Sequence, residues 1–202
     1  SLLLSTTAFA QQETAFSKKP FTDVLKTSVF FEGIEYLRER NVLKGYLDGT
    51  FHQDRRINRA EFLKFIVNPL VLDTNSLGEC IKANELSKSA TVFFSDVAKD
   101  AWYAPEACFA KDKHLIDGYP NGTYRPRRYI NFVEAAKIIS NVFSLEVVEE
   151  ETGEFWYRPY VRRLSELHAI PTSIQRFDQI LTRGEMAEIV YRLHADREDK
   201  SS

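Results

Sequence analysis

Arginine is concentrated in a few short stretches of this 202-residue chain, beside turns and at the starts of expected helices. A planar guanidinium can hold a carboxylate through two parallel, charge-assisted hydrogen bonds. These stretches therefore predict local positive charge suited to an anion, although the chain as a whole has 27 Lys and Arg against 29 Asp and Glu. The arginines concerned are Arg55, Arg56, Arg59, Arg125, Arg127, Arg128 and Arg183.

The composition narrows the class of protein. Nucleic-acid-binding domains have more Lys and Arg than Asp and Glu, whereas this chain has a net charge of −2 and a pI near 6.1, so we expect no nucleic-acid partner. With 44% hydrophobic residues the chain is predicted to be globular rather than disordered. Beyond the N-terminus no apolar run approaches the length needed to cross a bilayer.

Motifs for catalysis or metal binding are missing from the sequence. The four histidines, His52, His114, His168 and His194, have no metal-ligand spacing with one another or with the cysteines. There is no Gly-rich phosphate loop and no nucleophile elbow, and nothing sets two carboxylates at a catalytic separation. We therefore expect no metal site, no cofactor and no enzymatic activity.

The chain repeats itself at a displacement of 73 positions, without a gap. A third, more worn copy follows: Trp156-Tyr157 echoes Trp102-Tyr103, and the segment 181–185 echoes 57–61. This third copy lacks the Gly-Tyr pair and the following turn. Identical pairs between the first two copies include Asp23 and Asp96, Gly45 and Gly118, Tyr46 and Tyr119, Arg55 and Arg128, Asn58 and Asn131, and Glu61 and Glu134.

Each copy is predicted to be a helix, a loop and a second helix. Apolar residues recur at helical spacing on both sides of a loop that contains Asp48-Gly49 or Asn121-Gly122, pairs typical of tight turns. The second helix of each copy opens on a capping-box pattern, a Ser/Thr/Asn-type residue followed three residues later by Glu. Copies this short cannot bury their apolar faces alone, so we expect three to share one core. The capping pairs are Asn58 and Glu61, Asn131 and Glu134, and Thr182 and Glu185.

Three motifs in this order resemble the S-layer homology domain. They are the Phe-x-Asp-Val opening at 21–24 and 94–97, the Gly-Tyr turn at 45–51 and 118–124, and the Ile-Asn-Arg-Ala-Glu helix start at 57–61. The resemblance implies an all-α fold in which three helix-loop-helix repeats pack as a pseudo-three-fold helical prism around one core. It also implies non-covalent anchoring to the cell envelope through an anionic, typically pyruvylated, cell-wall polysaccharide bound between repeats.

The resemblance also assigns candidate binding residues. Arg59 and Arg183 stand at the arginine position of the helix-start motif, where a helix N-terminus adds weak positive potential. We expect the aspartates of the motifs to accept hydrogen bonds from sugar hydroxyls and the aromatic rings to stack on a sugar ring. The most intact set is expected to be Asp23, Gly45, Tyr46 and Arg59, joined by Asp96, Gly118, Tyr119 and Arg183.

Three alternatives stay open at this stage. Asp23 and Asp96 could instead cap the first helix of their copies. In the second copy Phe132 replaces the motif arginine, so either that groove binds nothing or Arg125, Arg127 or Arg128 supplies its charge. A different class of function is a structural envelope protein that contacts surface-layer proteins without binding sugar.

The segment 71–93 interrupts the repeats. Cys80 lies in it, and Cys108 lies in the expected first helix of the second copy. We predict a disulfide between them, with two free buried thiols as the alternative. Trp102 and Trp156 are expected to pack between repeats rather than to serve as sugar platforms.

The N-terminal ten residues resemble the end of a secretory signal peptide, with Ala8 and Ala10 fitting a cleavage site. A short apolar strand or helix is the alternative. Secretion to the cell surface is thus expected, with no membrane insertion after cleavage. The predicted boundaries are 1–10 signal remnant, 11–20 linker, 21–195 a single domain (repeat one 21–70, insertion 71–93, repeat two 94–145, repeat three 155–195) and 196–202 tail.

Overall fold

The computed structural model describes residues 19–70, 74–85, 91–148 and 153–201, and the predicted signal remnant lies outside these ranges. The described residues form α-helices and two 3-10 turns, with no β-strand among them, which confirms the predicted all-α class. None of their helices is long and apolar enough to cross a membrane. The helices are α1 (Phe31–Glu39), α2 (Arg59–Val67), α3 (Thr74–Glu85), α4 (Ala104–Asp112), α5 (Phe132–Val142), α6 (Arg158–Glu166) and α7 (Arg183–Ser201).

Six of these helices form three pairs, which we call the first (α1 and α2), second (α4 and α5) and third (α6 and α7) helix pairs. The opening helices α1, α4 and α6 each have nine residues. Each is followed two residues later by a residue in the left-handed region, Asn41, His114 or His168, with φ of 57°, 56° and 52°. Such a residue commonly terminates a helix. The third pair therefore keeps the backbone plan of the other two despite its divergent sequence.

The predicted capping boxes are all present. The Asn58 side chain accepts from the Glu61 backbone N–H, and the Glu61 side chain accepts from the Asn58 backbone; Asn131 and Glu134 do the same. At the start of α7, the Glu185 N–H donates to Thr182 Oγ1 at 3.2 Å, and the Thr182 N–H donates to Glu185 Oε2 at 2.9 Å. These exchanges satisfy backbone donors that a helix start leaves unpaired.

A ring of backbone hydrogen bonds joins the three pairs just before their second helices. Ile57 N–H donates to Leu181 O at 3.0 Å, Leu181 N–H to Ile130 O at 3.0 Å, and Ile130 N–H to Ile57 O at 3.2 Å. All three side chains are buried. The ring joins segments that are far apart in sequence in one core. It supports the pseudo-three-fold prism, which stays a prediction.

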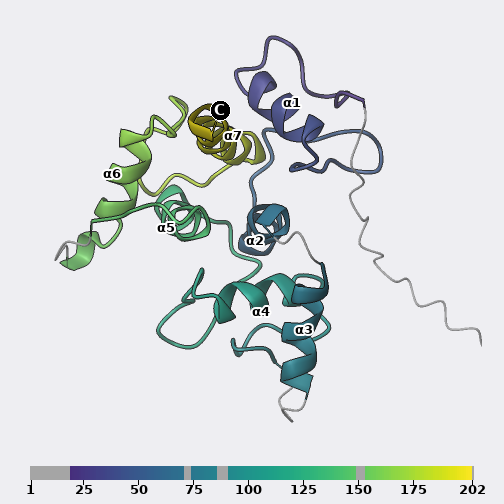
Figure 1. The fold of residues 1–202 in the computed structure, drawn as a ribbon, viewed down its shortest axis with the longest axis vertical. Coiled ribbons are helices and arrows are strands. Elements are labelled where there is room, and N and C mark those ends of the chain that lie inside the picture. Colours follow the sequence, from purple (N-terminus) through teal and green to yellow (C-terminus); the bar gives the residue numbers. More distant parts are fainter. Residues whose placement is uncertain (1–18, 71–73, 86–90, 149–152, 202) are drawn as a thin grey trace, which may run out of the picture.

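The helices are arranged so that each opening helix packs against the closing helix of another pair. The packed combinations are α4 with α2, α6 with α5, and α1 with α7. In Figure 1, α2, α5 and α7 are seen nearly end-on near the middle, and α1, α4 and α6 lie outside them. No pair is self-contained, because its opening helix covers a neighbour.

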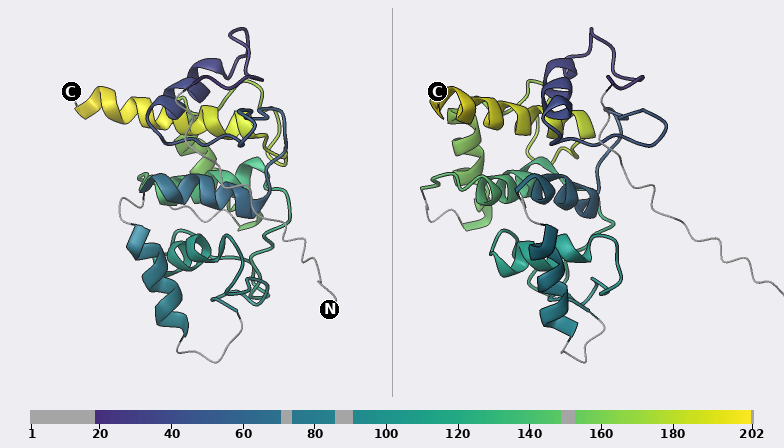
Figure 2. Two further views of the ribbon diagram at one scale, coloured as in Figure 1. Left: turned by 90° about the vertical axis from the view of Figure 1, so that its right-hand side faces the viewer. Right: turned by 45° about the vertical axis from the view of Figure 1, so that its right-hand side comes forward.

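Helix α3 was not predicted from the sequence. It lies within the expected insertion and packs beside α4 at the far end of the molecule from α7 (Figure 2). Cys80 on α3 and Cys108 on α4 form the predicted disulfide, with their Cα atoms 5.9 Å apart. Leu77 and Ile81 pack against the core from α3. The described part of the insertion therefore adds a helix that is fastened onto the second pair.

Two other expectations meet a different structure. Helix α7 continues to Ser201, through the segment expected to be a tail, and projects beyond the other helices (Figure 2). Trp102 and Trp156 remain 37% and 42% exposed, so neither is fully buried between repeats, although Trp102 lies against Lys64 of the first pair. The adjacent Tyr103 and Tyr157 take the inner positions against the core instead.

Candidate functional site

The two Gly-Tyr loops are shaped by tight turns and by close aromatic packing. Gly49 and Gly122 have φ of 83° and 77°, as the turn prediction requires. Gly118 lies under the ring of Phe94, and a Cβ atom at this position would come within 2.4 Å of the ring; Gly45 meets Phe21 in the same way. The two candidate glycines therefore let an aromatic ring lie directly on the loop backbone.

Asp23 and Asp96 hold the next part of each loop. The Asp96 carboxylate accepts from the backbone N–H groups of Tyr124 and Arg125 at 2.7 and 2.8 Å. Asp23 accepts from the corresponding two N–H groups of the first loop, both at 2.7 Å. The alternative role as helix caps is wrong, since neither α1 nor α4 has a side-chain cap. Both carboxylates bind a loop that comes about 28 residues later in the chain.

The Arg59 site lies where α2 begins against the loop of the second pair. Arg59 is only 5% exposed. Its Nε donates to the Tyr124 carbonyl at 2.8 Å, and the Tyr124 hydroxyl donates back to the Arg59 carbonyl at 2.9 Å. One Nη lies 3.8 Å from the carboxylate of Glu134. This reciprocal exchange fixes the guanidinium between two helix pairs.

Tyr119 is the aromatic centre of the Arg59 site. The guanidinium carbons of Arg125, Arg59 and Arg128 lie 4.0, 5.0 and 5.7 Å from its ring centroid. Its hydroxyl donates to Glu134 at 2.7 Å. Burial, followed by this hydrogen bond, raises the pKa of Tyr119, so the hydroxyl stays neutral. Three arginines against Glu134 and Asp96 leave this site with surplus positive charge.

The Arg183 site repeats this arrangement where α7 begins against the loop of the first pair. Arg183, 7% exposed, donates from Nε to the Phe51 carbonyl at 2.8 Å and from Nη2 to the Lys44 carbonyl at 3.2 Å. Its guanidinium carbon lies 5.1 Å from the Tyr46 ring centroid. Burial lowers the pKa of Arg183, although a guanidinium remains protonated in proteins.

The first helix pair also contributes an ion pair, formed by Arg55 and Glu61, to the Arg183 site. Arg55 donates to the Tyr46 hydroxyl and, at 2.6 Å, to Glu61. The His52 ring takes the place of Arg125, with its centroid 4.9 Å from that of Tyr46. The Arg183 site is therefore the same constellation with one fewer arginine.

The corresponding position between the second and third pairs has lost both guanidinium groups. Phe132, at the start of α5, is buried, and its N–H donates to the Gln179 carbonyl at 2.8 Å. The Gln179 side chain bonds Glu185 at 2.7 Å, in the place that arginine occupies in the other two pairs. Of the residues that could have supplied charge here, Arg125 and Arg128 lie at the Arg59 site. We call this place the Phe132 position.

The structure groups the candidate residues differently from the expected single set. Arg59 lies with Tyr119 and the loop of the second pair, not with Tyr46 of its own copy. This exchange follows from the backbone, because the Arg59 N–H donates to the Arg128 carbonyl across the pairs. The two sets are Arg59, Asp96, Gly118 and Tyr119, and Arg183, Asp23, Gly45 and Tyr46.

Sequence analysis missed two members of these sites. Tyr124 is fully buried and bonds Arg59 in both directions. Glu134 binds Tyr119 and Arg128 as well as capping α5, so a capping residue is also part of the site. Arg55 and Arg128 are identical residues at the 73-residue displacement, and so are Glu61 and Glu134. This repetition could have indicated that each of these arginines binds the capping glutamate of its own copy. Within the described residues no cluster of His, Cys, Asp and Glu could hold a metal ion.

Relatives of this chain include several surface proteins. It is 31% identical over 131 residues, 62% of its length, to "Cell surface glycoprotein 1" of Acetivibrio thermocellus. It is 23% identical over 190 residues, 94% of its length, to "Middle cell wall protein" of Brevibacillus brevis. A third relative, the "Cellulosome-anchoring protein" of A. thermocellus, is 31% identical over 96 residues, 48% of this chain.

The chain spans only 5%, 16% and 20% of the lengths of these three relatives. The matched segments include α1 and α4 and end within α2 and α5, and α6 and α7 lie outside them. Both loops that face Arg59 and Arg183 lie within the matched segments. Residues 20–63 and 93–140 match the S-layer homology domain.

Proposed function

We propose that this protein binds an anionic, pyruvylated cell-wall polysaccharide at the Arg59 and Arg183 sites and so holds a larger protein non-covalently on the cell envelope. It acts without catalysis. The third helix pair is a diverged third repeat, and the three repeats form a pseudo-three-fold prism whose Phe132 position does not bind a carboxylate.

The observation that carries this proposal is the placement of each arginine beside a tyrosine ring at a junction of two pairs. Arg59 uses Nε for the Tyr124 carbonyl, and a guanidinium has five N–H donors, so donors remain for a carboxylate. The tyrosine beside each guanidinium is partly exposed, and an aromatic ring can stack on the C–H side of a sugar. Near-complete burial fixes the geometry before the ligand arrives, which reduces the entropy lost on binding.

The relatives support the location. The names of three of them refer to the cell surface, the cell wall and cellulosome anchoring. A module that occupies a small share of such long chains suits an anchor for other domains.

The test is retention on purified cell-wall sacculi before and after chemical removal of the ketal pyruvate. We expect the wild-type protein to be retained only by pyruvylated walls, and Arg59→Gln with Arg183→Gln to lose retention. Arg176→Gln is the matched control, because Arg176 is exposed and forms an ion pair with the exposed Asp178. Thermal melts of each variant show whether it is folded.

Retention that survives removal of pyruvate would overturn the proposal. If such retention also requires surface-layer protein on the walls, the structural alternative is supported: an envelope assembly protein that acts through protein contacts.

A further inference from the structure

The Arg59 and Arg183 sites differ at one position beside the tyrosine. Arg125 and His52 are equivalent at the 73-residue displacement and directly follow the buried aromatic of each loop. Both have a left-handed backbone, with φ of 57° and 56°, and both donate their backbone N–H to the loop aspartate, at 2.8 and 2.7 Å. The two loops therefore present these side chains in the same way, and an imidazole in one site replaces a permanent cation in the other.

The charged groups around the two tyrosines also differ in number. The Arg59 site has three arginines and two carboxylates, whereas the Arg183 site has two arginines and three carboxylates. The additional carboxylate belongs to Asp48, which stands where the second loop has the uncharged Asn121. While His52 is neutral, the Arg183 site thus lacks the surplus positive charge of the Arg59 site. The groups counted are Arg59, Arg125, Arg128, Glu134 and Asp96 in one site, and Arg183, Arg55, Glu61, Asp23 and Asp48 in the other.

Hydrogen bonds to the His52 ring indicate which nitrogen carries its proton. The Thr50 hydroxyl lies 2.6 Å from an Asp48 carboxylate oxygen and 3.1 Å from His52 Nε2. Because an ionised carboxylate only accepts, the hydroxyl donates to Asp48 and accepts from His52, which assigns the proton of the neutral ring to Nε2. Nδ1 lies 3.5 Å from an oxygen of Asp23. A second proton, added at Nδ1, would therefore face this carboxylate.

Two carboxylates face the His52 ring. Asp23 reaches it from the segment before α1, and Asp48 reaches it through Thr50 from the turn of the same loop. Hydrogen bonds from the Thr50 side chain and backbone lower the pKa of Asp48, so this carboxylate stays ionised in the range where an imidazole titrates. Protonation of His52 would offset one of these two negative charges.

The cations near His52 lie on the other groups of the site. The guanidinium carbons of Arg183 and Arg55 are 5.1 and 5.8 Å from the Tyr46 ring centroid, and the His52 ring centroid is 4.9 Å from it. Arg55 is bonded to Glu61 at 2.6 Å, which offsets its charge. One tyrosine ring thus brings the imidazole and both guanidinium groups into one site.

We propose that His52 makes the Arg183 site an acid-dependent subsite for the carboxylated sugar, whereas the Arg59 site binds this sugar with the same strength across the range in which imidazole titrates. Imidazole is the side chain that ordinarily changes charge between about pH 5 and 8. At the lower end of this range, protonated His52 supplies the cation that Arg125 supplies permanently in the Arg59 site. The inference rests on the proposed function, because it concerns the strength of the same two sites.

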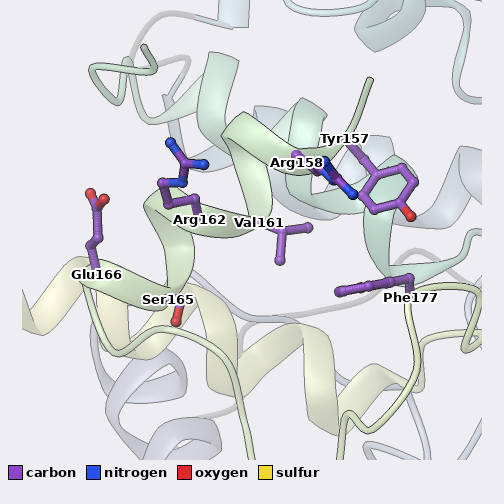
Figure 3. Close-up of a pocket in the computed structure, with 7 residues that line it drawn as sticks. All are labelled: Tyr157, Arg158, Val161, Arg162, Ser165, Glu166 and Phe177. Atoms are coloured by element: carbon purple, nitrogen blue, oxygen red, sulfur yellow. The ribbon is translucent and has the colours of Figure 1, made fainter. Parts of the chain in front are cut away.

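A pocket beside α6 does not share this property (Figure 3). None of the seven described residues that line it is a histidine. Its arginines already have partners, since the Arg158 guanidinium lies 4.3 Å from the Phe155 ring centroid and Arg162 is engaged as well. A sugar that bound in this pocket would not follow the titration of an imidazole, so acid-dependent binding distinguishes the Arg183 site from it.

Proteins with a single working site separate the two arginines. Arg59→Gln leaves the Arg183 site and Arg183→Gln leaves the Arg59 site, and calorimetric titration measures the Kd of each at about pH 8 and about pH 5.5. The probe is a pyruvylated disaccharide, whose carboxylate is ionised at both values because carboxylic acids titrate near about pH 4. In Arg59→Gln we expect the affinity to rise roughly fivefold at the lower pH, as for one added charge at a partly exposed site. In Arg183→Gln we expect no change.

Replacing the two side chains tests whether His52 carries the effect. His52→Asn cannot titrate and tolerates the left-handed backbone, and it should remove the rise in the Arg59→Gln protein. His52→Arg should make the Arg183 site independent of pH, and Arg125→His should make the Arg59 site acid-dependent. His114→Asn is the matched control, because His114 is exposed and has the same backbone conformation. Thermal melts at both pH values show whether each variant is folded.

Equal affinity at both pH values in Arg59→Gln would overturn the inference, and so would a rise at the lower pH that persists after His52→Asn. Either result leaves the proposed function intact when Arg183→Gln still prefers the pyruvylated disaccharide to the same disaccharide without pyruvate. If neither single-site protein prefers the pyruvylated probe at either pH, the proposed function is overturned instead.

Discussion

The second and third helix pairs have the same backbone plan but different polar chemistry. Both open with a nine-residue helix, turn through a histidine at positive φ and start the closing helix with a capping box. The loop of the second pair is held by Asp96, whereas that of the third is held by Gln179, which binds the Gln175 N–H and the Ser173 carbonyl. The backbone plan is therefore the same in both pairs, whereas the side chains that hold the loops differ.

The second and third pairs also differ in the residue that their loops face on the neighbouring pair. The arginine-rich loop of the second pair faces Arg59, while the loop of the third pair faces Phe132. A phenyl ring fills a buried position without needing hydrogen-bond partners, whereas a buried guanidinium needs carbonyl acceptors and aromatic faces. Phe132 in place of the helix-start arginine, together with Gln179 in place of the loop arginine, thus replaces two guanidinium groups and leaves the ring of Ile57, Ile130 and Leu181 in place.

The largest effect should come from releasing the extra helix of the second pair. Cys80→Ser with Cys108→Ser should lower the free energy of unfolding by about 3 to 4 kcal/mol, because the bridge limits the unfolded chain across a separation of 28 residues. Urea unfolding measures this loss. Trp102 fluorescence should follow the same transition, and an unchanged midpoint would show that α3 is bound to α4 without help from the bridge.

The side-chain hydrogen bonds that hold the two loops should contribute differently to the free energy of unfolding. Asp96→Ala leaves two backbone N–H groups without their acceptor and should cost about 3 kcal/mol of stability, whereas Gln179→Ala should cost about 1 kcal/mol because its two loop partners, Ser173 and Gln175, are exposed to water. Chemical unfolding of both variants provides the comparison. Asp96→Asn, which keeps one acceptor oxygen, should fall between them; equal costs for Asp96→Ala and Gln179→Ala would contradict the distinction between the two loops.

Ligand binding should distinguish the two junctions. Arg59→Gln should weaken the affinity for a pyruvylated disaccharide roughly tenfold to hundredfold, as expected for loss of a charge-assisted bond of about 1.5 to 3 kcal/mol. Phe132→Leu keeps the buried apolar volume and should leave the affinity unchanged. Calorimetric titration of both proteins makes the measurement, and a comparable loss in Phe132→Leu would place a working site at the Phe132 position.

The smallest effect concerns alkaline pH. Burial raises the pKa of Tyr124, while Phe51 in the equivalent place does not titrate. Because the folded-state pKa is raised, this contribution to stability is complete below the unfolded value of about 10 and is lost as the pH rises above it. Tyr124→Phe should cost about 1 kcal/mol at neutral pH, through loss of the bond to the Arg59 carbonyl, and reduce the alkaline loss.

Thermal melts between about pH 8 and 11 test this expectation. Phe51→Tyr, which places a hydroxyl at the Arg183 site, is the reciprocal variant. If Tyr124→Phe loses stability with rising pH as steeply as the wild type, another group controls the alkaline transition.

Patterns within short segments were predictable from the sequence. The Asn58, Asn131 and Thr182 caps depend on residues three apart, and the turns at Gly49 and Gly122 depend on adjacent residues. Helix α3 was not predicted, because its segment has no counterpart in the other copies. The partial exposure of Trp102 beside the more deeply placed Tyr103 was not predicted, since residue type alone does not say which of two neighbouring aromatics faces the core.

The helical class, the capped helix starts and the cysteine pair follow from residue type and spacing along the chain. Which arginine faces which loop depends instead on how the helix pairs pack. Arg59 and Tyr46 are close in sequence, yet the backbone bonds between pairs place Arg59 against Tyr119 and Arg183 against Tyr46. A site built between repeats is set by how the helices pack, and packing joins residues that no local pattern connects.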